Sequence, residues 1–329
     1  MRFLVTGGLG FIGSNFILHV LKKYPKIKIT NIDAELPGSN HHNLKNIIQN
    51  KNYEFFKGNI NNNKMVDKLV SRSDVVFNFA AESHVDRSIT NPRPFMDSNI
   101  LGAYTLLESV RKYKKKIIQI STDEVFGSLR TGSADEKYPF NPSSPYAASK
   151  ASAELLVQSY IKTYNCDAII TRCTNNYGPM QSPEKLIPKT IILAERESQI
   201  PIYGTGKNVR DWIFVLDHCE AILEIYSKGK TGESYNISAD NEIDNLTIVK
   251  KILDIMGKSK DLIYLTTDRP GHDFRYSLVS KKIKSKTNWK LRYDFKEGLE
   301  YTVEWYLSNK KWWKDTSDEI LGPHRWKTR

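Results

Sequence analysis

The stretch that most constrains the fold is a run of spaced glycines near the N-terminus. Residues 2–6, Arg-Phe-Leu-Val-Thr, predict a buried strand, and 7–13, Gly-Gly-Leu-Gly-Phe-Ile-Gly, follow it before a predicted helix. In this G-x-x-G-x-x-G pattern, Gly7 permits a tight turn, Gly10 lets another group approach the backbone, and Gly13 lets the helix pack closely on the strand. The chain is therefore expected to begin with a strand–turn–helix unit of an α/β fold.

Such a turn is also typical of a dinucleotide site, because the free amide groups at the start of the helix can hold phosphates. A second predicted strand, 27–32, is followed by Asp33, twenty residues after Gly13, where a carboxylate would bind the adenosine ribose hydroxyls. This carboxylate would repel a 2′-phosphate and no arginine follows it, so NAD is expected rather than NADP. The turn residues assigned to the cofactor are Gly7, Gly10, Phe11, Ile12 and Gly13.

Strands and helices alternate as far as residue 172, which implies right-handed crossovers and a parallel sheet. We expect an α/β chain: a Rossmann-type doubly wound parallel sheet with a smaller C-terminal α/β region that binds the substrate. The alternation breaks at 175–179. The predicted parts are 1–178 for the NAD-binding domain and 179–329 for the second region, with 211–240 returning to the first.

Composition narrows the class of partner. The 329 residues carry a net charge of +12, but the basic residues are scattered, so we attribute the charge to overall composition and expect no nucleic acid partner. No apolar run approaches the ~20 residues of a membrane span, and Met1 leads straight into a strand, so neither a membrane nor a signal peptide is expected. Cys166, Cys173 and Cys219 lack metal-binding spacing, which predicts no metal, reduced thiols and a cytoplasmic location.

Two short segments carry the residues expected to do chemistry. Residues 121–127, Ser-Thr-Asp-Glu-Val-Phe-Gly, follow an apolar strand at the sheet edge where α/β proteins bind ligands. Tyr146 and Lys150 share one helix face, and the lysine with a nicotinamide ring would stabilise a phenolate that removes a hydroxyl proton as hydride leaves. Lys150 would also hold the nicotinamide ribose. Neighbouring carboxyl groups tend to split in pKa, so Asp123 and Glu124 suit an acid and a base for the elimination of water.

These segments together resemble the extended short-chain dehydrogenase/reductases and, within them, the nucleoside-diphosphate-glucose 4,6-dehydratases. The similarity extends to about residue 300, and the Thr-Asp-Glu triplet is its most specific signal. The matching motifs are TGGLGFIGSN (6–15), AAESHVDRSI (80–89), STDEVFG (121–127), YAASK (146–150), RCTNNYGP (172–179), PEKLIP (183–188), GKNVRDW (206–212) and DRPGHD (268–273).

The resemblance implies a reaction that uses NAD and regenerates it. Tyr146, assisted by Thr122 and Lys150, would start the oxidation of C4 of the glucose. Glu124 would then remove the C5 proton, and Asp123 would protonate the C6 hydroxyl as water leaves. Hydride would return to C6, which gives a 4-keto-6-deoxy sugar nucleotide for rhamnose or another deoxysugar.

The resemblance also implies binding residues and a homodimer formed through helices 97–113 and 146–164. The cofactor residues beyond the glycine turn are Asp33, Asn59, Ile60, Ala80, Ala81, Ser98, Tyr146, Lys150 and Asn176. The residues matched to the nucleotide sugar are Ser83, Thr122, Asn175, Lys185, Leu186, Pro201, Ile202, Tyr203, Arg210, Asn245, Arg269 and His272. Of these, Arg210 and Arg269 suit a diphosphate by charge and donor geometry.

The chain departs from the family pattern in three places. Phe126 replaces a tyrosine near the site, 34–39 replaces the usual segment after the ribose aspartate, and the family's late tyrosine near the base has no clear counterpart. Because thymine and uracil differ by one methyl group, the expected substrate is either dTDP-glucose or UDP-glucose, and the sequence does not choose between them.

Two alternatives to a dehydratase are a nucleotide-sugar 4-epimerase and a non-catalytic NAD-sensing protein. The acid pair argues against the first, and the four intact catalytic side chains argue against the second. His84 is interpreted as a structural or substrate-edge histidine, and the tail residues Trp312, Trp313 and Trp326 as packing anchors.

Overall fold

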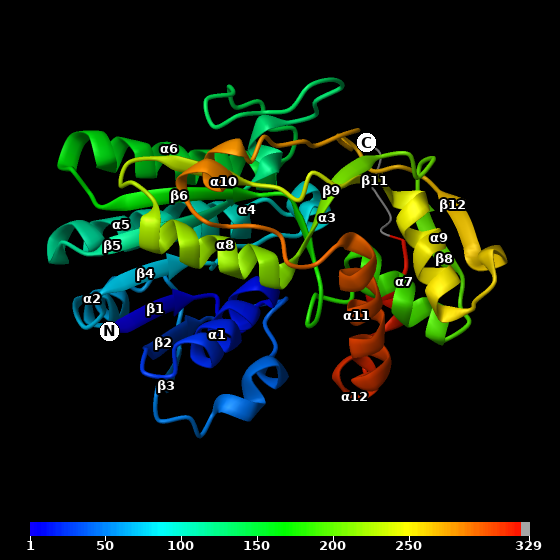
Figure 1. Ribbon diagram of the computed structural model, residues 1–329, viewed down its shortest axis with the longest axis horizontal. Coiled ribbons are helices and arrows are strands. Elements are labelled where there is room, and N and C mark those ends of the chain that lie inside the picture. The colour runs from blue at the N-terminus through cyan, green and yellow to red at the C-terminus, as the bar shows by residue number, and fades with distance from the viewer. Residues whose placement is uncertain (324–329) are drawn as a thin grey trace.

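The computed structural model describes residues 1–323, and its largest element is a seven-stranded sheet (Figure 1). The strand order is β10-β6-β5-β4-β1-β2-β3 and all neighbours pair in parallel, so the predicted Rossmann-type α/β class is confirmed. The strands are β1 (Arg2–Thr6), β2 (Lys28–Asp33), β3 (Tyr53–Lys57), β4 (Val75–Asn78), β5 (Lys116–Thr122), β6 (Ala168–Cys173) and β10 (Ser234–Ile237).

Helices cover both faces of this sheet because successive strand residues point to opposite sides. In β1, Phe3 and Val5 face one layer and Leu4 faces the other, and all three are buried. The first layer contains α1 (Phe11–Lys23) and α8 (Val215–Lys228). The second layer contains α2 (Asn63–Ser71), α5 (Gly102–Tyr113) and α6 (Pro145–Tyr164). The apolar strands read from the sequence are thus buried on both sides.

A second core lies to one side of the sheet, around two small sheets (Figure 1). The first has the order β11 (Glu242–Asp244), β9 (Val209–Phe214) and β7 (Asn175–Tyr177); the second pairs β8 (Ile200–Tyr203) with β12 (Ile263–Thr266). The helices of this core are α7 (Leu186–Glu195), α9 (Asn245–Met256) and α11 (Phe295–Ser308). Within 211–240, β10 belongs to the seven-stranded sheet and α8 packs against it, whereas most of β9 belongs to the three-stranded sheet. The domain boundary itself stays a prediction.

Shorter elements connect these layers. The helix predicted over 97–113 begins with a π-helical turn, η2, before α5, and α6 begins where Ser144 caps it by accepting a hydrogen bond from the Ala147 amide at 3.1 Å. The remaining elements are η1 (His41–Ile47), α3 (Val85–Thr90), α4 (Arg93–Phe95), η2 (Met96–Leu101), η3 (Asp123–Phe126), η4 (Lys260–Leu262), α10 (Lys281–Lys286), α12 (Lys310–Trp313) and α13 (Asp318–Leu321).

The tail packs on the rest of the chain. The indole nitrogens of Trp312 and Trp313 donate to the Asn43 side chain and the Tyr306 carbonyl, each at 2.8 Å, so both act as the predicted packing anchors. Trp326 lies outside the described residues. Within residues 1–323, none of the helices has the length and apolar character needed to cross a membrane.

Candidate active site

One cleft lies at the carboxyl ends of the central strands, the edge where α/β sheets bind ligands. Its lining includes both Asp33, at the end of β2, and Tyr146, in the first turn of α6. Every residue assigned to the cofactor contributes to this lining: Gly7, Gly10, Phe11, Ile12, Gly13, Asp33, Asn59, Ile60, Ala80, Ala81, Ser98, Tyr146, Lys150 and Asn176.

The glycine turn has the geometry that its spacing predicts. Gly7 has φ +67°, and a Cβ there would lie 2.7 Å from the backbone of Ala80. A Cβ on Gly13 would lie 2.4 Å from the Gly7 carbonyl oxygen, whereas at Gly10 the nearest atom would be 3.3 Å away. Gly7 and Gly13 are thus required by packing, while Gly10 keeps the cleft side of the turn open. Because no side chain caps the start of α1, its first amides are left for an anion, which fits a pyrophosphate.

Asp33 is fixed by backbone and side-chain donors. Its carboxylate accepts hydrogen bonds from the amides of Leu9 (2.9 Å) and Glu35 (2.8 Å) and from the Ser39 hydroxyl (2.7 Å). A carboxylate has about four acceptor sites, so it can still accept a ribose hydroxyl. The unusual segment 34–39 therefore supports the aspartate through Ser39, and it also lines the cleft.

Tyr146 and Lys150 face the cleft from α6. The Lys150 ammonium donates to the Ile120 carbonyl at 2.6 Å, which ties the helix to β5. Burial lowers the pKa of Lys150 to about 8, although the carboxylate of Glu154 opposes this shift. Burial also raises the pKa of Tyr146 well above its ordinary value, and Glu124 adds to the effect. The chain alone therefore holds Tyr146 protonated.

Asp123 and Glu124 begin η3 directly after β5. The Thr122 hydroxyl caps this turn, since it accepts from the Glu124 amide at 3.4 Å and donates to Asp123 Oδ1 at 3.0 Å. Burial, and then the neighbouring Glu124, raises the pKa of Asp123 to about 8, so it is mostly protonated at neutral pH. Burial also raises the pKa of Glu124, but the cations Arg269, Lys185 and Arg210 act against it.

The residues assigned to the nucleotide sugar fall into two groups. Ser83, Thr122, Asn175 and Lys185 line the cleft. The others lie outside this lining: Leu186, Pro201, Ile202, Tyr203, Arg210, Asn245, Arg269 and His272. Pro201 and Ile202 are buried within β8, so a ligand could meet only their backbone. Their role in binding stays a prediction.

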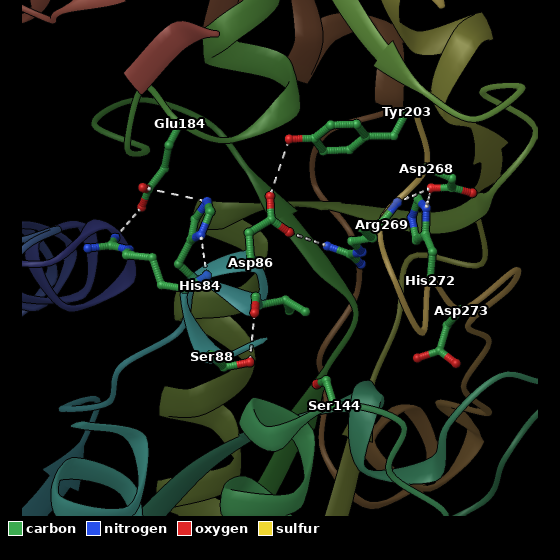
Figure 2. Close-up of polar contacts among 12 residues, drawn as sticks. His84, Asp86, Ser88, Ser144, Glu184, Tyr203, Asp268, Arg269, His272 and Asp273 are labelled. Carbon is green, nitrogen blue, oxygen red and sulfur yellow. Dashed lines mark hydrogen bonds and ion pairs between the residues drawn. The ribbon is translucent and has the colours of Figure 1, made fainter. Parts of the chain in front are cut away.

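The two arginines assigned to the diphosphate have different environments. Arg210 is buried, donates to the carbonyls of Val209 (2.7 Å), Asp273 (2.9 Å) and Phe274 (3.2 Å), and lies over the Tyr276 ring at 4.4 Å. Arg269 instead pairs with Asp86 at 3.2 Å (Figure 2). The guanidinium of Arg210 thus makes more hydrogen bonds to the protein than that of Arg269 does.

A tyrosine outside the set of predicted site residues lies near Glu124. Tyr276 is buried next to Arg210, and the charge of Glu124 helps to raise its pKa well above the ordinary value, after burial. It follows the Asp-Arg-Pro-Gly-His-Asp motif by three residues, and that position was the available signal. The expectation that the family's late tyrosine has no clear counterpart in the C-terminal tail stays a prediction.

Phe126 does not leave a gap in the cleft. Its ring is 1% exposed and packs 5.0 Å from the guanidinium of Arg172, which is paired with Glu154 at 2.7 Å inside the protein. A cation over an aromatic face is a stable arrangement. The missing hydroxyl therefore falls in the core beside η3 and outside the cleft lining.

His84 has a structural role. Its Nδ1 accepts from the Arg87 amide at 3.4 Å at the start of α3, and its Nε2 lies 3.5 Å from Glu184 (Figure 2). Burial and the cations Lys185 and Arg87 strongly lower its pKa, so the ring is neutral. Glu184, which was not predicted, lines the cleft and also accepts from Arg87 at 2.6 Å.

All three cysteines are free and buried. Cys173 reaches the cleft lining, and burial raises the pKa of its thiol to about 12. Burial also raises the pKa values of Cys166 and Cys219. In the described part of the chain, no group of three His, Cys, Asp or Glu side chains is arranged to hold a metal ion.

Comparisons with known proteins agree with this geometry. A family model described as GDP-mannose 4,6 dehydratase matches residues 4–302. A dTDP-glucose 4,6-dehydratase from Xanthomonas campestris is 42% identical over 331 residues, which cover 94% of each chain. The structure of a dTDP-glucose 4,6-dehydratase from Bacillus anthracis, in complex with NAD, has 46% identity and a TM-score of 0.90 over 95% of this chain and 99% of that one. A dTDP-glucose 4,6-dehydratase from Streptomyces venezuelae, also with NAD, has 39% identity and a TM-score of 0.93 over the same shares.

The parallel sheet, the glycine turn and the Tyr–Lys pair define an enzyme of the extended short-chain dehydrogenase/reductase type. More narrowly, the chain belongs to the family described as GDP-mannose 4,6 dehydratase, and its similarity to the nucleoside-diphosphate-glucose 4,6-dehydratases is confirmed.

Proposed function

We propose that the chain is an NAD-dependent nucleoside-diphosphate-glucose 4,6-dehydratase. One observation carries the proposal: Asp123 and Glu124 share a cleft with Tyr146 and Lys150. A 4-epimerase needs the tyrosine and lysine but no acid pair, and a sensor needs neither pair. The names of the relatives favour dTDP-glucose as the substrate over UDP-glucose.

The glycine turn, Asp33 and Lys150 would hold the cofactor. When bound, NAD would accept hydride from C4 of the glucose and later return it to C6. Tyr146, helped by Thr122, takes the proton of the C4 hydroxyl during the oxidation. Burial keeps Tyr146 protonated in the chain alone, so we propose that the positive charges of Lys150 and of the nicotinamide ring together lower its pKa when the cofactor is bound.

The elimination step falls to the acid pair. Once C4 is a ketone, the C5 proton is acidic, and Glu124 removes it. Asp123 gives its proton to the C6 hydroxyl, which leaves as water, so a C5–C6 double bond forms without net redox change. Reduction at C6 and protonation at C5 complete the 4-keto-6-deoxy sugar. The opposite roles fit the electrostatics, since Glu124 faces three cations and Asp123 is held protonated near neutral pH.

The test is to incubate the protein with dTDP-glucose or UDP-glucose in deuterated water, without added reductant, and to follow the sugar by NMR. We expect a 4-keto-6-deoxy product with deuterium at C5, formed with higher kcat/KM from dTDP-glucose. Conversion to a galactose nucleotide would instead establish the epimerase. Bound NAD without turnover of either sugar would contradict the proposal.

A variant sharpens the assignment of the base. Glu124→Gln should still oxidise C4 but fail to exchange C5 or eliminate water, because an amide cannot take the proton. Glu197→Gln, at a side chain 75% exposed that pairs with Lys258, is the matched control and should behave as wild type. Normal product formation by Glu124→Gln would show that another group is the base.

We further propose a homodimer that forms through η2, α5 and α6. Four large apolar side chains on these helices are exposed in the single chain: Leu101, Tyr104, Leu155 and Tyr164. Burying them against a second copy would remove apolar surface from water. The free, buried cysteines support a reducing compartment, and on that basis we propose a cytoplasmic location.

A further inference from the structure

We propose that Asp86 is a positioning residue: anchored by the Tyr203 hydroxyl, it holds Arg269 so that the guanidinium can bind the diphosphate of the nucleotide sugar. This inference rests on the proposed function. Asp86 belongs to the segment Ala-Glu-Ser-His-Val-Asp-Arg-Ser-Ile (81–89), and no role was assigned to it from the sequence.

The two carboxylate oxygens of Asp86 have different partners (Figure 2). Oδ1 accepts from the Arg269 guanidinium at 3.2 Å, and Oδ2 accepts from the Tyr203 hydroxyl at 3.4 Å. The Asp86 side chain is 10% exposed and that of Arg269 is 16% exposed. Solvent therefore screens this ion pair little, and the Asp86 carboxylate can fix the orientation of the Arg269 guanidinium.

The contacts connect a helix to two segments of the smaller region. Asp86 lies in the first turn of α3, which is capped by His84 and fastened by the Ser88 hydroxyl bond to the Val85 carbonyl at 2.7 Å. Tyr203 ends β8, and Arg269 lies in the irregular loop after β12. A carboxylate on a fixed helix thus supports an arginine on a loop that has little regular structure of its own.

Arg269 keeps a donor for a ligand. Its terminal nitrogen is used by Asp86, but its Nε is buried without a hydrogen-bond partner among the described residues. A buried unpaired donor is costly, so a phosphate oxygen at that position would be strongly favoured. Neither Asp86 nor Arg269 contributes to the lining of the cofactor cleft, so the proposed diphosphate contact lies beside that cleft.

The charges around this site explain why a support is needed. The cations Lys185, Arg87, Lys189 and Arg269 together lower the pKa of His84, after burial, so they act on the same small volume. Burial alone would lower the pKa of Arg269, yet the carboxylates of Asp86 and Glu124 raise it. Without Asp86, repulsion from the other cations would drive Arg269 toward solvent.

The test measures dTDP binding by calorimetry to the NAD-loaded protein and to its Asp86→Asn variant. We expect the Kd of dTDP to rise about tenfold or more, the scale of one lost charge-assisted hydrogen bond. The KM for dTDP-glucose should rise by the same factor while kcat changes by less than about threefold, since a uniform binding contact is removed. NAD retention should not change.

The decisive comparison is a double-mutant cycle with Arg269→Ala. If Asp86 acts through Arg269, adding Asp86→Asn to Arg269→Ala weakens dTDP binding no further. Additive losses would overturn the inference, as would unchanged or tighter binding in Asp86→Asn. Asp318→Asn is the matched control, because its pair with Arg196 has a similar length of 3.1 Å but lies at a carboxylate 97% exposed.

If Asp86→Asn does not fold, Asp86→Glu keeps the charge but displaces it by one methylene, and it should also weaken dTDP binding. Wild-type binding of dTDP with no sugar turnover would defeat the proposed function and leave the cycle interpretable. Turnover by the wild type together with an additive cycle would defeat the positioning role alone.

Discussion

Asp123 and Glu124 are adjacent in the chain and burial raises the pKa of both, but their charged neighbours differ. Asp123 is buried against a neighbouring carboxylate and shares a hydrogen bond with Thr122, whereas Glu124 lies in the field of Arg269, Lys185 and Arg210. The same residue class can therefore supply an acid and a base at one pH.

The first expected outcome is a loss of elimination rate as the pH rises through about 8. The pKa of Asp123 is raised to about 8, so its proton is available below that pH and is lost above it. Lys150 has a pKa of about 8 as well, so the two groups titrate together in wild type. In Asp123→Asn, the rate of the oxidation step can be measured against pH by the absorbance of the cofactor. Any change in that rate near pH 8 is then due to Lys150, because residue 123 no longer titrates. An elimination rate that stays constant well above this pH would contradict the assignment.

The second expected outcome concerns the stability of the folded chain. In the unfolded chain Asp123 ionises near the ordinary aspartate pKa of 3.8, but in the folded chain its pKa is about 8. Ionisation of Asp123 therefore does not lower the free energy of unfolding below about pH 4. The free energy of unfolding falls as the pH rises from about 4 to about 8, and the loss is constant above about pH 8. Asp123→Asn should raise Tm, with a gain over wild type that grows between these limits. Calorimetry across the range checks this, and a gain that shrinks with pH would refute it.

Sequence reasoning located the chemistry at this scale because its residues are local. Tyr146 and Lys150 are one helical turn apart, and the acid pair follows the strand directly. Tyr276 and Asp86 were missed because their importance depends on partners far along the chain, such as Arg210 and Arg269.

Among the elements, the turn between β1 and α1 depends on two glycines for packing and on one for ligand access. Gly13→Ala places a methyl group 2.4 Å from the Gly7 carbonyl, so we expect a destabilisation of about 1–3 kcal/mol in urea unfolding. Gly10→Ala meets its nearest atom at 3.3 Å, so its stability should change less while NAD binding weakens. Equal effects of the two substitutions on unfolding would contradict these separate roles.

The missed elements have a common cause. β7 and β11 have three residues each and β12 has four, and such lengths carry no measurable alternation of apolar and polar residues. The longer strands and helices were predictable because two buried faces require continuous apolar runs. The π-helical start before α5 lies in contact with α6 and has no signature in the sequence.

For the whole molecule, the proposed homodimer depends on the exposed apolar side chains of η2, α5 and α6. Leu155→Arg, at a side chain 55% exposed on α6, should convert the proposed dimer into a monomer in sedimentation velocity. Leu265→Arg is the control, because Leu265 is 58% exposed but lies on β12, away from these helices. A wild-type monomer, or a dimer that survives Leu155→Arg, would exclude this interface.

The overall class followed from the order of elements, since alternating strands and helices allow few topologies. The arrangement of the smaller region did not, because β7, β9 and β11 come from distant segments and join a sheet that only the folded chain defines.

The burial of every thiol gives the molecule a practical property. Cys166, Cys173 and Cys219 remain protonated at neutral pH, because burial raises the pKa of each. Alkylating probes react with thiolates, so we expect the three native cysteines to react little with them in the folded chain. A cysteine introduced on the surface, for example at Leu265, would then be the one position to take up a maleimide dye. Fluorescence from such a reporter would test whether the neighbouring 268–273 loop moves during turnover.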